Sequence, residues 1–109
     1  MSIALAWVYL ILAGLLDVAW ATAVKQSDGY TRHGWTIASL LLLATFVYLL
    51  GKAVKVLPIG TAYAVWTGIG AAGVTLVGIW FFGESGSPAR ISGIGLVVAG
   101  IILLKLAPS

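Results

Sequence analysis

The sequence has no cysteine and little charge: only 8% of its 109 residues are Asp, Glu, Lys or Arg. The absence of cysteine excludes disulfide scaffolds, thiolate metal sites and cysteine nucleophiles. With 61% hydrophobic residues, the chain has too little polar surface to face water on all sides, so we expect it in lipid. The lone histidine, His33, is expected to be an ordinary loop residue.

Motifs typical of enzymatic catalysis are also missing. The sequence has no phosphate-binding loop, nucleophile triad, metal-ligand cluster or pair of carboxylates, so we predict that it is not an enzyme and uses no cofactor or metal. The net charge of +3 does not indicate nucleic-acid binding, because the six basic residues stand singly at helix ends and in loops. Contacts with lipid head groups explain these residues better.

Long apolar runs are the main feature that is present. A bilayer core of roughly 30 Å takes about 20 apolar residues of helix, and four such runs are separated by short polar breaks. Because the runs are continuous and not alternating, helices are favoured over a β-barrel. We therefore predict an all-α membrane protein, a single domain over residues 1–109, with transmembrane helices at 3–24, 35–57, 59–82 and 91–106.

The basic residues predict no preferred orientation in the membrane, since each side of the four spans carries the same number. The side of the N-terminus holds Lys52, Lys55 and Lys105, and the other side holds Lys25, Arg32 and Arg90. Such a chain can insert both ways, and two opposed copies would form an antiparallel dimer. The alternative is a single topology set by the α-amino group or the exact helix ends. Four helices also enclose little space, which predicts oligomerisation.

Asp17 is the only acidic residue at membrane depth, near the middle of the first predicted helix. A charge at that depth costs at least ~2.5 kcal/mol on insertion scales, and such residues usually mark ion or proton pathways. Trp20 lies three residues further on the same face, and an acid beside an indole makes a site for a cation. The alternative is a protonated Asp that only hydrogen-bonds between helices.

The third helix carries a second aromatic pair, Tyr63 and Trp66, three residues apart and therefore on one face. Packing alone would explain an isolated pair, but this pair begins an unusually polar and glycine-rich stretch for a membrane span. Gly68 and Gly70 in that stretch loosen the helix and favour a bend.

The fourth helix has neither an acid nor an aromatic residue. Gly93 and Gly100 lie seven residues apart with Leu96 between them, which makes a grooved face suited to helix association. We therefore predict that this helix forms a dimer interface and is not part of a binding site.

Together these residues resemble the small multidrug resistance family, which comprises four-helix bacterial exporters, over the whole chain. The segments that carry the resemblance are 13–20 (AGLLDVAW), 28–32 (DGYTR), 57–66 (LPIGTAYAVW) and the glycine face of the last helix. Within the family, Trp20, Thr67 and the ending 100–105 (GIILLK) are more similar to the guanidinium-exporter branch than to the polyaromatic-cation branch.

The resemblance implies a multi-pass protein of the bacterial inner membrane that works as an antiparallel homodimer with alternating access. Two membrane acids would bind either protons or one cationic substrate, Tyr63 and Trp66 would line the site, and Gly68 and Gly70 would supply a bend that differs between the subunits. We therefore predict proton-coupled export of small guanidinium-type cations, in which protons and substrate compete for Asp17.

Two residues depart from the family pattern. The family acid is almost always Glu, and Asp17 is one methylene shorter, which draws the carboxylate back by about 1.5 Å. Phe46 stands where the guanidinium branch usually has a small Ser; we expect Phe46, Thr45 and Thr67 around the site. Three alternatives remain open: an exporter of quaternary ammonium and other hydrophobic cations, one half of an obligate heterodimeric pair, and a membrane assembly subunit without transport activity.

Overall fold

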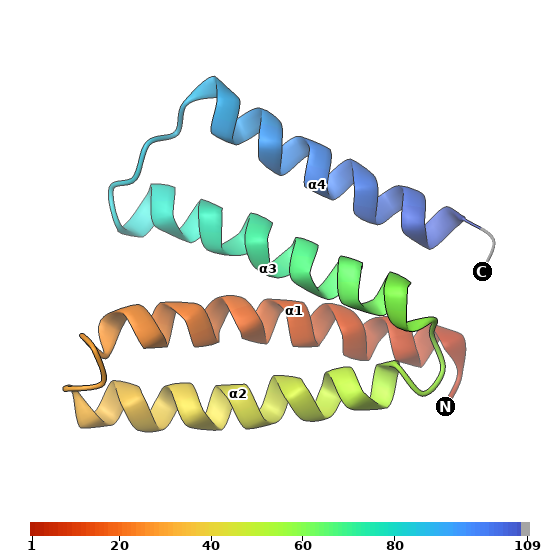
Figure 1. The fold of residues 1–109 in the computed structure, drawn as a ribbon, viewed down its shortest axis with the longest axis horizontal. Coiled ribbons are helices and arrows are strands. Elements are labelled where there is room, and N and C mark those ends of the chain that lie inside the picture. The colour runs from red at the N-terminus through yellow and green to blue at the C-terminus, as the bar shows by residue number, and fades with distance from the viewer. Residues whose placement is uncertain (108–109) are drawn as a thin grey trace.

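In the computed structural model, which describes residues 1–107, the chain forms four helices. They are α1 (Ile3–Gln26), α2 (His33–Ala53), α3 (Ile59–Phe81) and α4 (Pro88–Leu106) (Figure 1). All four are long and apolar enough to cross a bilayer, and residues 1–107 contain no strand. The prediction of an all-α protein with four membrane-spanning helices is therefore confirmed.

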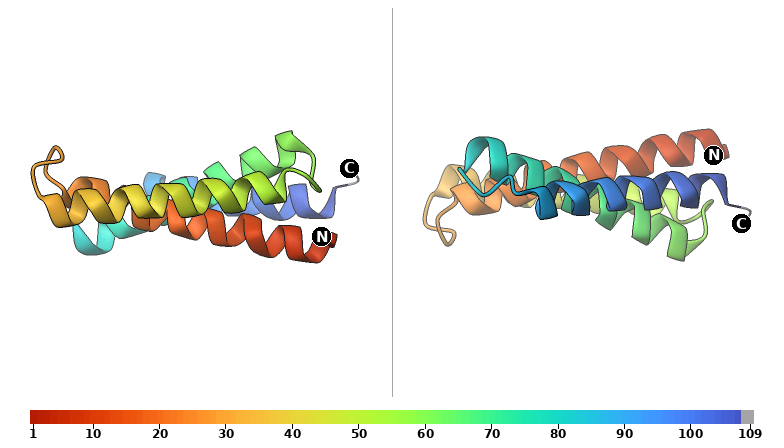
Figure 2. Two further views of the ribbon diagram at one scale, coloured as in Figure 1. Left: turned by 90° about the horizontal axis from the view of Figure 1, so that it is seen from below. Right: turned by 90° about the horizontal axis from the view of Figure 1, so that it is seen from above.

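The four helices lie side by side in one layer, in the order α2, α1, α3, α4 (Figure 1). α1 packs against both α2 and α3, whereas α4 packs mainly against α3. Lys105 of α4 also reaches α1, where its Nζ lies 5.2 Å from the centroid of the Trp7 ring. The Cα atoms extend over 43 × 34 × 16 Å, and Figure 2 shows the thin layer edge-on. Because a helix with its side chains is about 10–12 Å across, a layer this thin leaves every helix open on at least one side.

The layer has two distinct ends, which we call the terminal end and the loop end. The N-terminus, the end of α4 and the α2–α3 turn lie at the terminal end, and the α1–α2 and α3–α4 loops lie at the loop end (Figure 1). The terminal end holds Lys52, Lys55 and Lys105, and the loop end holds Lys25, Arg32 and Arg90. Neither end therefore has an excess of Lys and Arg.

α2 begins at His33 and not at residue 35, so the expectation that His33 lies in a loop is wrong. The helix also ends earlier than predicted, at Ala53 and not at residue 57. The backbone N–H groups of Val56 and Leu57 both donate to the Ala53 carbonyl oxygen, at 3.1 and 3.0 Å, and close a turn there. Pro58 disfavours helical backbone at the residue before it, so the chain leaves the helix before α3 begins.

α4 begins earlier than predicted, at Pro88 and not at residue 91. The Ser87 hydroxyl caps the helix by accepting a hydrogen bond from the Arg90 backbone N–H at 3.3 Å. Proline suits the first helical position because its missing N–H would have no partner there in any case. The serine and proline therefore start the helix and do not merely end the loop.

Glycines bring α1 and α3 close together. A Cβ atom added to Gly14 of α1 would lie 2.8 Å from the Cβ atom of Ile69 on α3, and one added to Gly73 of α3 would collide with the Val18 side chain on α1. Towards the terminal end, the first three helices close over a buried cluster of Ala6, Leu10, Ala53, Leu57, Ala62 and Val65. The α1–α3 contact is thus set by backbone approach at glycine.

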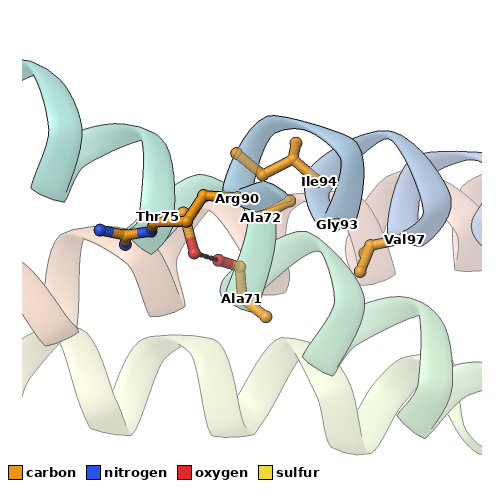
Figure 3. Close-up of a pocket in the computed structure, with 7 residues that line it drawn as sticks. All are labelled: Ala71, Ala72, Thr75, Arg90, Gly93, Ile94 and Val97. Carbon is orange, nitrogen blue, oxygen red and sulfur yellow. Dashed lines mark hydrogen bonds between the residues drawn. The ribbon is translucent and has the colours of Figure 1, made fainter. Parts of the chain in front are cut away.

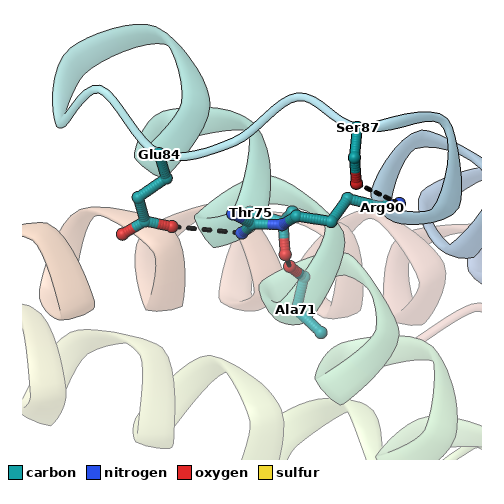
Figure 4. A network of polar contacts seen from close by, with 5 residues as sticks. All are labelled: Ala71, Thr75, Glu84, Ser87 and Arg90. Atoms are coloured by element: carbon teal, nitrogen blue, oxygen red, sulfur yellow. Dashed lines mark hydrogen bonds and ion pairs between the residues drawn. The ribbon is translucent and has the colours of Figure 1, made fainter.

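Glu84 holds the α3–α4 loop against both helices that it joins. Its backbone N–H donates to the Gly78 carbonyl oxygen at 3.0 Å, and its carboxylate accepts a hydrogen bond from the Arg90 guanidinium at 3.1 Å (Figure 4). Both charged side chains are partly exposed, and exposed ion pairs contribute about 0–1 kcal/mol. The pair therefore orients the start of α4 more than it stabilises the fold.

The close α1–α3 contact predicts that Gly14→Ala destabilises the protein by about 1–3 kcal/mol through overpacking against Ile69. Gly95→Ala on α4 is a matched control, because a Cβ atom there meets nothing within 4 Å. Both substitutions carry the same gain in helix propensity. Thermal unfolding in detergent, followed by circular dichroism, should show a lower Tm for Gly14→Ala only. Equal Tm values would contradict the close approach of the two helices.

Candidate functional site

Asp17 lies on the side of α1 that faces α3. One of its carboxylate oxygens is so close to Gly70 that a Cβ atom added to this glycine would collide with it, and the carboxyl carbon would be 3.3 Å from that atom. The Asp17 side chain is half-buried, and among the described residues it takes part in no hydrogen bond or ion pair. A carboxylate at this depth needs a proton, a cation or a second chain to balance its charge.

Four aromatic rings from three helices form a continuous cluster near Asp17. Phe46 of α2 lies between the indoles of Trp20 on α1 and Trp66 on α3, with ring centroids 5.8 and 5.7 Å away. Tyr63 of α3 extends this aromatic cluster, with its ring 5.4 Å from that of Trp66. These separations are typical of favourable aromatic pairs. Phe46 is only 3% exposed and Tyr63 is 59% exposed, so the cluster runs from the interior to an outer face.

The carboxylate and the aromatic cluster lie about one helical turn apart on both helices. On α1, Trp20 follows Asp17 by three residues, and on α3, Gly70 follows Trp66 by four, spacings that put residues on one face. The structure thus brings together in one region the residues that the sequence assigned to substrate and proton binding. A cation held there would meet both a negative charge and aromatic rings.

Trp66 carries a buried hydrogen-bond donor that is not satisfied. Its ring nitrogen Nε1 has no acceptor within residues 1–107. A buried polar group left in this state costs about 1–3 kcal/mol, so an acceptor from another conformation, a ligand or a second chain would stabilise it. A guanidinium ion offers only donors and cannot fill this role, whereas a carboxylate can.

Of the three residues expected around the site, only Phe46 lies in the aromatic cluster. The Thr45 hydroxyl donates to the Leu41 carbonyl oxygen at 2.8 Å and the Thr67 hydroxyl donates to the Tyr63 carbonyl oxygen at 2.7 Å, so both serve their own helices. Thr67 lines a cleft towards α4. The central position of Phe46 went unrecognised in the sequence, because its place on α2 does not reveal which rings of α1 and α3 it meets.

Gly68 and Gly70 face different neighbours. A Cβ atom at Gly68 would lie 3.1 Å from Cδ1 of Ile101 and 3.3 Å from Cγ1 of Val97, both on α4, whereas Gly70 faces Asp17 on α1. α3 continues as an α-helix through both positions. The bend that the sequence favours at these glycines therefore stays a prediction.

The glycine face of α4 is uncovered in the single chain. A Cβ atom at Gly93 or Gly100 would meet nothing within 4 Å, and Leu96 between them is 75% exposed. α4 has no buried residue among those described. The face predicted for dimerisation is thus free to receive another helix.

Two of the open clefts that flank the helices contain neither Asp17 nor a ring of the aromatic cluster. The cleft between α3 and α4 has a volume of about 280 Å³ and is lined by Ala71, Ala72, Thr75, Arg90, Gly93, Ile94 and Val97 (Figure 3). The other, of about 670 Å³, lies at the loop end and is lined mainly by apolar residues of α1, α2 and α3. Neither of these two clefts offers a carboxylate to a cation. Asp17, which lies at membrane depth beside the aromatic cluster, is the candidate site.

Comparisons with known proteins agree over almost the entire length. The family model described as Small Multidrug Resistance protein matches residues 5–97. A protein of Yersinia pseudotuberculosis named guanidinium exporter is 54% identical over 103 residues, which cover 94% of this chain and 99% of that protein. Proteins of the same name from Citrobacter freundii and Salmonella typhimurium are 48% identical over 103 residues, which cover 94% of this chain and 98% of theirs.

The central position of Phe46 predicts that Phe46→Ala destabilises the protein by about 3–5 kcal/mol, because it removes a buried ring that contacts two indoles. Tyr48→Ala is the matched control, since it removes a ring that is 62% exposed from the same helix. Thermal unfolding in detergent should show a much lower Tm for Phe46→Ala, and near-ultraviolet circular dichroism should lose aromatic signal. Similar Tm values for the two variants would contradict this packing.

Proposed function

The chain belongs to the small multidrug resistance family of membrane exporters, and we propose that it exports small guanidinium-type cations in exchange for protons. It is a multi-pass protein of the bacterial inner membrane, a transport protein for small cations and not an enzyme. The observation that carries the proposal is the carboxylate of Asp17, which lies in a membrane helix next to the aromatic cluster and has no hydrogen-bond or ion-pair partner within residues 1–107.

Asp17 and the aromatic cluster offer a planar cation two kinds of contact. A carboxylate accepts two parallel N–H bonds from the fork of a guanidinium ion. The faces of Trp and Tyr rings attract a cation within about 6 Å of the ring centroid. Tyr63 has the most exposed side chain of the aromatic cluster. Both contacts are stronger in hydrocarbon than in water because the dielectric constant is lower.

Competition for one carboxyl group would couple the two fluxes. In hydrocarbon the group is tolerated when it carries a proton or is paired with a cation, and it is costly when it is charged and empty. A carrier that changes sides only in the loaded states therefore exchanges one cation for protons. The gradient of protons into the cell then drives the cation out.

We propose an antiparallel homodimer as the working unit. The single layer leaves Asp17 half-buried, so a second layer is needed to shield the loaded site from lipid. The uncovered face of Gly93, Leu96 and Gly100 supports an α4 interface, and equal numbers of Lys and Arg at the two ends support insertion in both orientations. Alternating access would follow if α3 bends at Gly68 and Gly70 in one subunit only.

A second candidate is export of quaternary ammonium and other hydrophobic cations. It is favoured by Phe46, which places a buried ring between the two indoles. The hydroxyls of Thr45 and Thr67 donate within their own helices, so Asp17 is the charged hydrogen-bond acceptor that this region offers a substrate. Such a site suits a cation with few donors and a large apolar surface.

Asp17→Asn is expected to abolish exchange, because an amide can neither bind a proton at neutral pH nor neutralise a cation. The assay is guanidinium uptake driven by a pH gradient into proteoliposomes made from this chain alone. Asp28→Asn in the α1–α2 loop is the matched control and should transport normally. Uptake by Asp17→Asn equal to that of the wild type would refute the mechanism. No uptake by the wild type would favour an obligate partner chain or an assembly subunit.

Substrate choice is expected to favour guanidinium over tetraethylammonium by about tenfold or more in apparent affinity. The carboxylate can bond to the flat ion through two N–H groups, whereas the quaternary ion has none to offer. Release of protons on adding each cation to detergent-solubilised protein in weak buffer measures both affinities. The reverse order would support the hydrophobic-cation exporter, and no proton release from either would indicate that Asp17 serves only in packing.

A further inference from the structure

The α1–α3 interface is built from side chains that each lie against a glycine of the opposite helix. Ile69 lies against Gly14, Asp17 against Gly70, and Val18 against Gly73. At each of these positions the glycine leaves a notch in the surface of its helix, and a neighbouring side chain fills that notch. Asp17 is the only one of the three side chains that can gain or lose charge.

Gly70 allows the short side chain of Asp17 to reach α3. The glycine is buried, and a carboxylate oxygen of Asp17 occupies the space that any side chain at this position would need. The carboxylate therefore lies against α3 at a position where the helix presents no side chain of its own. Any residue larger than glycine at position 70 would have to displace either the carboxyl group or the helix.

Resting on the proposed function, we propose that Gly70 is a positioning residue that acts through Asp17. Its notch is a seat for the carboxyl group on α3, so a proton or cation taken up by Asp17 alters a contact that holds α1 and α3 together. The two flanking contacts, at Gly14 and Gly73, are apolar and do not change with loading. Occupancy of the site is thereby transmitted to α3 at a single point.

Few other charged groups can contribute to this effect. The titratable or charged residues on the helices packed against α1 are Tyr63 on α3 and His33, Tyr48 and Lys52 on α2. None of them forms a hydrogen bond or ion pair with Asp17. A change in the titration of Asp17 after a substitution at position 70 would therefore report on the seat itself.

The first test compares Gly70→Ala with Gly73→Ala. Both substitutions add one methyl group to the α1–α3 interface, where it would collide with a side chain of α1. Only the methyl group at position 70 would contact the carboxyl group of Asp17. The readout is the infrared carboxyl band of Asp17, identified as the band that Asp17→Asn removes, titrated with pH in the full-length protein without substrate. Adding guanidinium to the wild type in the same experiment tests the proposed function separately.

We expect Gly70→Ala to shift the band or to move its midpoint by about half a pH unit or more, because solvation and contacts set proton affinity. Gly73→Ala should leave both close to the wild type. Identical titrations for the two variants would overturn the proposed role of Gly70. If guanidinium leaves the wild-type band unchanged while Gly70→Ala still shifts it, the proposed function fails and the role of Gly70 in positioning Asp17 is still supported.

A double-mutant cycle covers the case in which Gly70→Ala is too unstable for the pH titration but still gives an unfolding transition. Asp17→Ala removes the carboxyl group and frees the space that the new methyl group needs. We therefore expect Gly70→Ala to lower Tm much less in the Asp17→Ala background than in the wild type, and Gly73→Ala to lower it equally in both. An equal loss of stability from Gly70→Ala in the two backgrounds would overturn the proposal.

Discussion

An acid in the middle of a membrane helix requires a proton or a positive charge, and Asp17 has no such partner among the residues described here. The rest of the structure is arranged around this requirement. α1, which carries the acid, packs against both α2 and α3, so rings from two neighbouring helices reach the same region. Gly70 lets α3 approach closely enough for the carboxyl group to lie against its backbone.

The single layer of helices is the main support for the proposed second copy. A carboxyl group placed between α1 and α3 in a layer with a Cα thickness of 16 Å cannot be surrounded by its own chain, and it stays half-buried. α4 extends the layer without covering the site, since it packs mainly on α3 and leaves its glycine face open. The same geometry therefore favours both an incomplete site and an available surface for a second copy.

The aromatic cluster is the apolar part of the candidate site. Phe46 lies between Trp20 and Trp66 and offers neither indole a hydrogen-bond acceptor. The unsatisfied Nε1 of Trp66 is consistent with this apolar neighbour. In the proposed function, the rings would add cation–π contacts to the hydrogen bonds that Asp17 accepts from a cation.

The sequence by itself determined that the chain forms four membrane helices, because long apolar runs can satisfy their backbone groups in hydrocarbon only as helices. It also singled out Asp17, since an acid within such a run stands out without any knowledge of its neighbours. Helix limits at Ala53 and Pro88 depended on local turn and cap geometry, which apolar periodicity does not encode. Only the tertiary structure decided that Phe46 lies between two indoles and that Asp17 lies on Gly70, because both contacts join different helices whose relative register is set by close packing.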